Sequence, residues 1–189
     1  MSGVNMRFKR IPAGKRPYPI KSFLLAILLV TVFIACTQKL VSKKTVIDGR
    51  EMLFGKISAE QLYFDYPDWQ QGEKAYQPDK NLITKISGLP ADFSVKIFLA
   101  TWCPDSKREV PHFFKILKAA GLFGKVDVQM WAVNRKLKLA DGLAAQHNIK
   151  RVPTFIFYRN GEEIGRIIES PQSFLLEEDV YQILSGAGE

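Results

Sequence analysis

Cys103 is the residue of this chain whose type and setting most favour chemistry. A cysteine thiolate is the nucleophile of thiol–disulfide exchange. Cys103 follows an apolar run and precedes a helical pattern, so we expect it at the start of a helix. Unpaired backbone N–H groups and the positive end of the helix dipole stabilise an anion there. The alternative is a structural thiol, because free cysteine is among the most buried residue types.

The neighbours of Cys103 complete the candidate site. Ser106 could donate its hydroxyl proton to the sulfur, and Lys107 adds positive charge in the first helical turn. Asp105 opposes this effect as an acid beside the sulfur in sequence. The candidate catalytic residues are Cys103 and Ser106, and the supporting residues are Trp102, Pro104, Asp105 and Lys107.

The chain from residue 90 onward predicts the elements that hold this site. The apolar run 95–100 predicts a buried strand, and a helical pattern follows Cys103 and ends near Gly121. Further on, we expect strands over 126–133, 154–158 and 163–169, helices over 137–147 and 174–184, and a hairpin turn at Asn160-Gly161. This order predicts an α/β fold with a central mixed sheet and helices on both faces.

Four features of this region, taken together, resemble the thioredoxin family. They are Trp102-Cys103-x-x-Ser106-Lys107, Pro111 inside the following helix, Val152-Pro153-Thr154, and the Asn160-Gly161 turn. The resemblance covers about residues 90–187, and its nearest subgroup is the membrane-tethered thioredoxin-like proteins of bacterial envelopes. It implies a thioredoxin fold, with Val152, Pro153 and Thr154 as a cis-proline loop that binds extended substrate.

Two departures from the family pattern bear on mechanism. Ser106 stands where dithiol members have a second cysteine, so it cannot release a mixed disulfide. Ile97 stands where many members bury an acid, so that proton relay is missing. The resemblance therefore implies a monothiol site.

Residues 51–89 predict an N-terminal extension packed on the domain of residues 90–189. Short helical pieces are expected over 51–55 and 58–64, the second opened by a capping signature at Ser58. An aromatic cluster follows, consisting of Tyr63, Phe64, Tyr66, Trp69 and Tyr76. These rings could line a substrate groove, but packing against the domain is the favoured interpretation.

The net charge of +8 belongs to the N-terminus. Residues 1–35 hold six bases and no acid, and the remaining 21 bases face 19 acids. No basic stripe remains elsewhere, so the sequence predicts no nucleic-acid partner.

The N-terminus predicts export. Residues 23–35 form an uncharged, mostly apolar run, which is shorter than the roughly 20 residues of a membrane-spanning helix and fits a signal peptide. The run ends at Ala35-Cys36, which resembles the lipobox of bacterial lipoproteins and implies lipidation of Cys36. An uncleaved anchor and a cleaved signal are the alternatives. We expect an anchor over 1–36, a tether over 37–50 and an envelope location outside the cytoplasm.

Two functions remain open from the sequence. The first is a monothiol oxidoreductase that acts through Cys103 on disulfides or oxidised thiols of exported proteins, with a thiol reductant as partner. The second is a non-redox peptide-binding or chaperone module in which Cys103 is a remnant. No cofactor is expected, and no metal site either, because one cysteine with the scattered His112 and His147 cannot form a zinc site.

Overall fold

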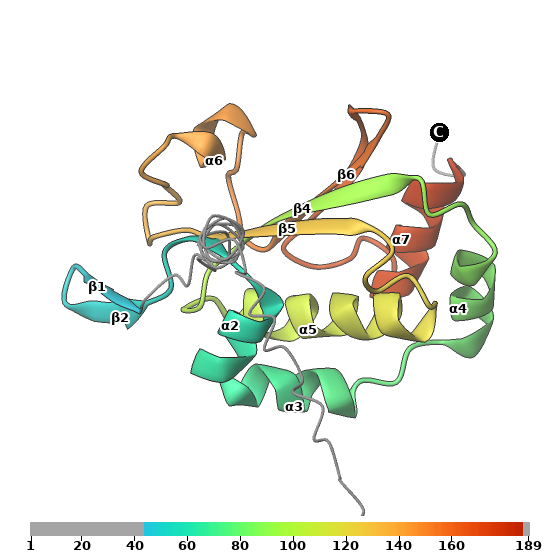
Figure 1. The fold of residues 1–189 in the computed structure, drawn as a ribbon, viewed down its shortest axis with the longest axis horizontal. Coiled ribbons are helices and arrows are strands. Elements are labelled where there is room, and N and C mark those ends of the chain that lie inside the picture. Colours follow the sequence, from blue (N-terminus) through green and yellow to red (C-terminus); the bar gives the residue numbers. More distant parts are fainter. Residues whose placement is uncertain (1–43, 187–189) are drawn as a thin grey trace, which may run out of the picture. The chain divides into compact units, whose positions relative to one another are not determined.

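A five-stranded sheet organises the part of the chain that the computed structural model describes, residues 44–186 (Figure 1). Its strand order is β3-β5-β4-β6-β7, with β4 and β5 parallel and the other neighbours antiparallel. The strands are β3 (Gly55–Ile57), β4 (Phe93–Leu99), β5 (Asp127–Ala132), β6 (Thr154–Arg159) and β7 (Glu162–Ile168). The expected anchor, Cys36 and the tether up to residue 43 lie outside the described residues.

Helices lie on both faces of the sheet, as predicted. They are α2 (Ala59–Asp65), α3 (Pro67–Ala75), α4 (Lys80–Ser87), α5 (Pro104–Ala119), α6 (Leu143–Gln146) and α7 (Leu176–Ser185). The short α6 lies on one face, and the other helices lie on the opposite face (Figure 1). In residues 44–186 no helix combines the length and the apolar character that crossing a membrane requires.

In the central strand β4, Phe93, Val95, Ile97 and Leu99 are buried along one face, and Phe98 is buried on the other, where Ser94 and Lys96 are only half-buried. Val95, Ile97 and Leu99 belong to the main core, which they share with α5 and α7. Phe98 points the other way, into a second cluster that includes Cys103. The strand therefore connects the main core to the candidate site.

The helix predicted over 51–55 is wrong. The chain there forms a two-stranded hairpin of β1 (Thr45–Ile47) and β2 (Arg50–Met52), and then begins β3. Asp48 and Gly49 have positive φ angles of 51° and 73°, as the tight turn of a two-residue hairpin requires. This Asp-Gly turn signal outweighs the helical propensity that follows it, and it places the last residues of the expected tether in a folded hairpin.

The helix predicted over 137–147 is also mostly wrong, because only Leu143–Gln146 are helical. The side chain of Asn134 accepts hydrogen bonds from the backbone N–H groups of Lys136 and Lys138, at 3.0 and 2.9 Å. Leu137 between them takes a positive φ of 56°, which no helix permits. The Asn134 side chain therefore binds the backbone of the residues that follow it and stabilises a loop where a helix was predicted.

Residues 51–89 contribute to the sheet and to the main core. β3 pairs with β5 at the sheet edge, and Leu62, Trp69 and Ile86 are buried with the residues of α5 and α7. Ser58 caps α2 as predicted, accepting the backbone N–H of Gln61 at 3.1 Å. Of the five clustered aromatic residues, Phe64 alone is highly exposed, at 84%.

A buried carboxylate ties this segment to the C-terminal helix. Glu177 of α7 is fully buried and accepts the Tyr76 hydroxyl and the Asp79 backbone N–H, each at 2.6 Å. Burial and the bond to Glu177 raise the pKa of Tyr76 above its ordinary value. The linker between α3 and α4 is therefore fixed to the far end of the chain.

Candidate active site around Cys103

Cys103 lies at the junction that the sequence predicted, as the N-cap residue of α5. Its backbone is extended, with φ −95° and ψ 123°, and Pro104 at the first helical position has the fixed φ that starts a helix. The Cys103 side chain makes no capping hydrogen bond to the helix. It is 8% exposed, so the sulfur is close to the surface but largely covered.

The predicted cis-proline loop covers the sulfur. The Cys103 thiol donates a hydrogen bond to the carbonyl oxygen of Val152 at 3.1 Å. The Val152-Pro153 peptide is cis, as the resemblance implied. The Thr154 hydroxyl donates to the carbonyl of Arg151 at 2.8 Å and so fixes the same loop. The structure therefore brings Val152, Pro153 and Thr154 to the thiol.

Ser106 is fully buried but does not bind the sulfur as expected. Its hydroxyl oxygen accepts the backbone N–H of Ala100 at 3.2 Å. Ala100 follows the last residue of β4, so its N–H has no partner in the sheet and takes the nearest buried acceptor. Ser106 thus holds the strand end against the helix start, which is a positioning role.

The charged neighbours of the thiol are paired with one another or with α3. Lys107 forms an ion pair with Asp68 of α3 at 2.6 Å, and its hydrogen bond lowers the pKa of Asp68. Asp105 pairs with Arg108 at 2.9 Å. We had expected Lys107 and Asp105 to act on the thiol in opposite directions. Each is instead paired with another charged residue, so both effects on the thiol are reduced.

Trp102 is half-buried beside the thiol, and sequence reasoning missed its partner. The guanidinium carbon of Arg135 lies 4.9 Å from the centre of the Trp102 ring, a cation–π contact. The indole Nε1 is buried and has no hydrogen-bond partner within residues 44–186. Arg135 lies between the predicted strand over 126–133 and the predicted helix over 137–147, so no sequence signal placed it at the site.

Cys103 belongs to a buried apolar cluster. The second cluster joins Cys103 to Phe98 and Trp131 of the sheet and to Leu139 and Ile149, which lie on either side of α6. An apolar environment has a low effective dielectric constant, which strengthens any charge interaction made at the sulfur.

His112 is remote from the sulfur. It lies nine residues after Cys103, about 13.5 Å along the helix at 1.5 Å per residue. Its ring stacks on Tyr76, with centroids 3.8 Å apart. Burial, followed by the nearby Arg108, lowers the pKa of His112, while Glu177 acts in the opposite direction.

We expect this stack to make folding sensitive to pH. The unfolded histidine takes up a proton near pH 6.5 and the folded one only at lower pH, so acid stabilises the unfolded chain. His112→Phe keeps the stack without the proton. Urea unfolding should show the free energy of unfolding of the parent falling relative to the variant from pH 7.5 to pH 5. Parallel curves would contradict the prediction.

Comparisons with known proteins agree with this geometry. A family model described as Thioredoxin matches residues 64–178. Thioredoxin M-type of Spinacia oleracea chloroplasts is 31% identical over 88 residues, and the match covers 47% of this chain and 45% of that protein. The chain therefore spans about half the length of this curated relative.

The chain is also similar to solved structures. A Pseudomonas aeruginosa protein of unknown function is 14% identical with a TM-score of 0.51, covering 64% of this chain and 82% of that one. Mitochondrial thioredoxin 3 of Saccharomyces cerevisiae is 20% identical with a TM-score of 0.36, covering 61% and 98%. The first likeness supports the fold, and the family model covers well over half of the sequence. The chain belongs to the thioredoxin family.

Proposed function

We propose that the protein is a thiol–disulfide oxidoreductase of monothiol type, with Cys103 as its nucleophile. The observation that carries the proposal is the contact between the Cys103 sulfur and the Val152 carbonyl. This contact places a lone thiol at a helix start against a cis-proline loop. An extended chain bound along that loop would present its own sulfur to Cys103.

The proposed reaction has two exchange steps. The Cys103 thiolate attacks one sulfur of a substrate disulfide or glutathione adduct, which forms a mixed disulfide and releases the other sulfur as a thiolate. Ser106 has no sulfur, so a second thiol of the substrate or a small thiol must attack the mixed disulfide and return Cys103 to its reduced form. Such a site suits single-cysteine adducts and disulfide shuffling.

The proposal includes an extracytoplasmic location. The uncharged run 23–35 and the Ala35-Cys36 sequence support export and lipidation of Cys36. Exported proteins that carry thiols or disulfides are then the substrates. Mass spectrometry of the purified protein would show an acylated Cys36 as the first residue, and an intact Met1 would count against this part.

One observation favours a second function, a non-redox peptide-binding module. Cys103 is 8% exposed, and its thiol donates a hydrogen bond to the Val152 carbonyl oxygen, so the loop covers the sulfur. In that case Val152, Pro153 and Thr154 would bind a chain without any exchange.

Turnover of a glutathionylated peptide distinguishes the two functions. The full chain with Cys36→Ala leaves Cys103 as its sole cysteine. With glutathione as reductant, we expect a mixed disulfide between Cys103 and the peptide, followed by catalysed release of the peptide thiol. Cys103→Ser should reduce the rate to the uncatalysed background because the nucleophile is gone.

Ser106→Ala is the matched control. It removes a hydroxyl from the same site but leaves the sulfur, so most of the rate should remain. Background rates in the parent, with peptide binding that survives Cys103→Ser, would favour the non-redox module instead.

A further inference from the structure

Positive charge in the described domain is concentrated in one segment beside the thiol. From residue 44 to the end, 19 bases balance 19 acids. Residues 134–151, which we name the basic loop, hold five bases and one acid, Asp141. The bases are Arg135, Lys136, Lys138, Lys150 and Arg151. The rest of the domain therefore carries a compensating negative excess.

The basic loop is packed against the active site. Its apolar residues Leu139 and Ile149 are buried in the same cluster as Cys103. Near its start, Arg135 lies over the ring of Trp102. At its end, Arg151 directly precedes Val152, which accepts the thiol hydrogen bond. The two ends of the basic loop therefore adjoin Trp102, which precedes Cys103, and Val152, which contacts its thiol.

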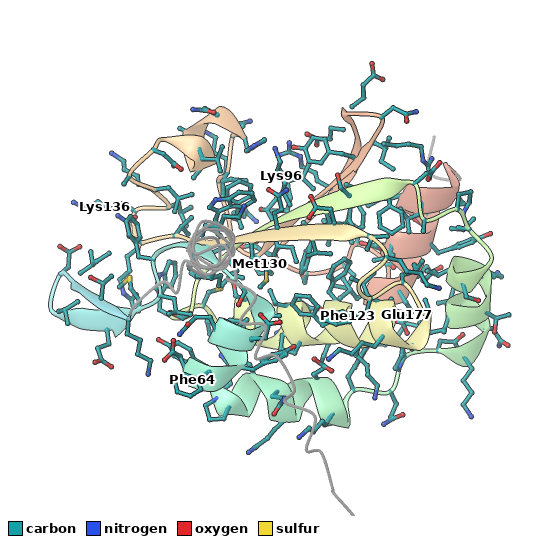
Figure 2. The ribbon with its side chains drawn as sticks, in the orientation of Figure 1. Phe64, Lys96, Phe123, Met130, Lys136 and Glu177 are labelled. Carbon is teal, nitrogen blue, oxygen red and sulfur yellow. The ribbon has the colours of Figure 1, made fainter. Side chains whose placement is uncertain are left out.

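Three of these cations have no internal partner. Lys136, Lys138 and Lys150 are exposed, and none forms an ion pair within residues 44–186. In Figure 2 the side chain of Lys136 extends outward from the segment between β5 and α6. By contrast, Lys107 on α5 is paired with Asp68. Unlike Lys107, the three lysines of the basic loop are therefore not neutralised by an ion pair within residues 44–186.

A surface pocket next to the cis-proline loop is lined by positively charged residues. It has a volume of about 470 Å³ and no lining carboxylate, and its lining residues are Asn148, Lys150, Arg151, Thr154, Arg166 and Ile168. Arg151 and Arg166 have acidic partners elsewhere, Glu169 and Glu163, at 2.7 and 2.6 Å. Lys150 is therefore the cation of this pocket most open to a ligand carboxylate.

We propose that the basic loop selects polypeptide substrates whose reactive sulfur is flanked by aspartate or glutamate. The inference rests on the proposed function and specifies its substrate class. Cations around a nucleophile raise the local concentration of an acidic partner and speed its encounter, an effect that salt weakens. A protein partner is favoured over an anionic lipid surface for two reasons. Arg135 lies over the ring of Trp102, the residue before Cys103. Lys150 and Arg151 line the pocket beside the cis-proline loop that contacts the thiol.

The test measures mixed-disulfide formation with three peptides of equal length. Each has one cysteine joined to thionitrobenzoate as a disulfide, and the flanking residues are acidic, neutral or basic. The Cys103 thiolate attacks the peptide sulfur, the S–S bond of the reagent breaks, and coloured thionitrobenzoate leaves. The full chain with Cys36→Ala should react about tenfold faster with the acidic than with the neutral peptide at low salt. The preference should disappear at high salt.

Two sets of lysine substitutions test whether the preference for the acidic peptide comes from the basic loop. Lys136→Gln, Lys138→Gln and Lys150→Gln together should abolish the acidic preference and leave the neutral rate unchanged. The control combines Lys74→Gln, Lys80→Gln and Lys125→Gln, which removes the same charge from exposed positions elsewhere and should keep the preference. Equal rates for all three peptides would overturn the inference and leave the proposed function intact, whereas no reaction with any peptide would overturn both.

A membrane role is the remaining outcome. The same variants can be bound to vesicles of equal parts phosphatidylglycerol and phosphatidylcholine. Weaker vesicle binding of the loop variant than of the control, with no preference among the peptides, would assign the basic loop to the lipid surface and overturn the substrate inference.

Discussion

Ser106→Cys should convert the protein into a dithiol reductant. The side chains of an N-cap residue and the third helical residue face each other, as capping boxes show, so Cys103 and the new thiol should be within reach of a disulfide. Intramolecular resolution then replaces attack by an external thiol. We expect insulin-disulfide reduction with dithiothreitol as donor to be faster than the parent by roughly tenfold or more.

Ser106→Ala separates this gain from any structural effect. Both variants deprive the Ala100 N–H of its hydroxyl acceptor, which should cost each about 1 kcal/mol of stability. Ser106→Ala should show no gain in insulin reduction. A Ser106→Cys protein no more active than the parent would mean that the two side chains do not meet.

The helix start at Cys103 and the cis-proline loop were predictable because their signals are local. Pro104 and the apolar spacing after it mark the helix start at Cys103, and the structure has the helix there. The cis bond before Pro153 and the place of its loop came from the family resemblance, and the structure agrees. In both cases a few residues, close in sequence, determine the local backbone.

The sequence could not predict contacts that depend on distant partners. Arg135 reaches Trp102 because Asn134 folds the following residues into a loop, and the apolar spacing of that segment had suggested a helix. Lys107 forms an ion pair with Asp68 on α3, a helix that the sequence pattern did not predict. The role of Ser106 likewise depends on the free N–H of Ala100 at a strand end. Side-chain pairing between elements carries no periodic signal.

Removing the residues before position 90, the expected start of the domain, should have the largest effect on stability. A chain beginning at residue 90 should fail to fold, whereas one beginning at residue 44 should fold. The shorter chain loses β3 from the sheet edge and loses the core residues Leu62, Trp69 and Ile86. It also leaves the buried Glu177 without Tyr76 and Asp79. Near-ultraviolet circular dichroism and urea unfolding would show the presence or loss of a cooperative transition.

Point variants of the whole chain also test whether residues 51–89 contribute to its stability. Trp69→Ala removes a fully buried indole and should lower the free energy of unfolding by about 3–5 kcal/mol. Phe64→Ala is the control, because this neighbouring ring is 84% exposed and its loss should change stability by less than about 0.5 kcal/mol. Domains of this size are stable by about 5–15 kcal/mol, so losing Trp69 with its buried neighbours exceeds the margin. Equal stabilities for the two variants, or cooperative unfolding of the chain from residue 90, would instead make residues 51–89 a separable extension.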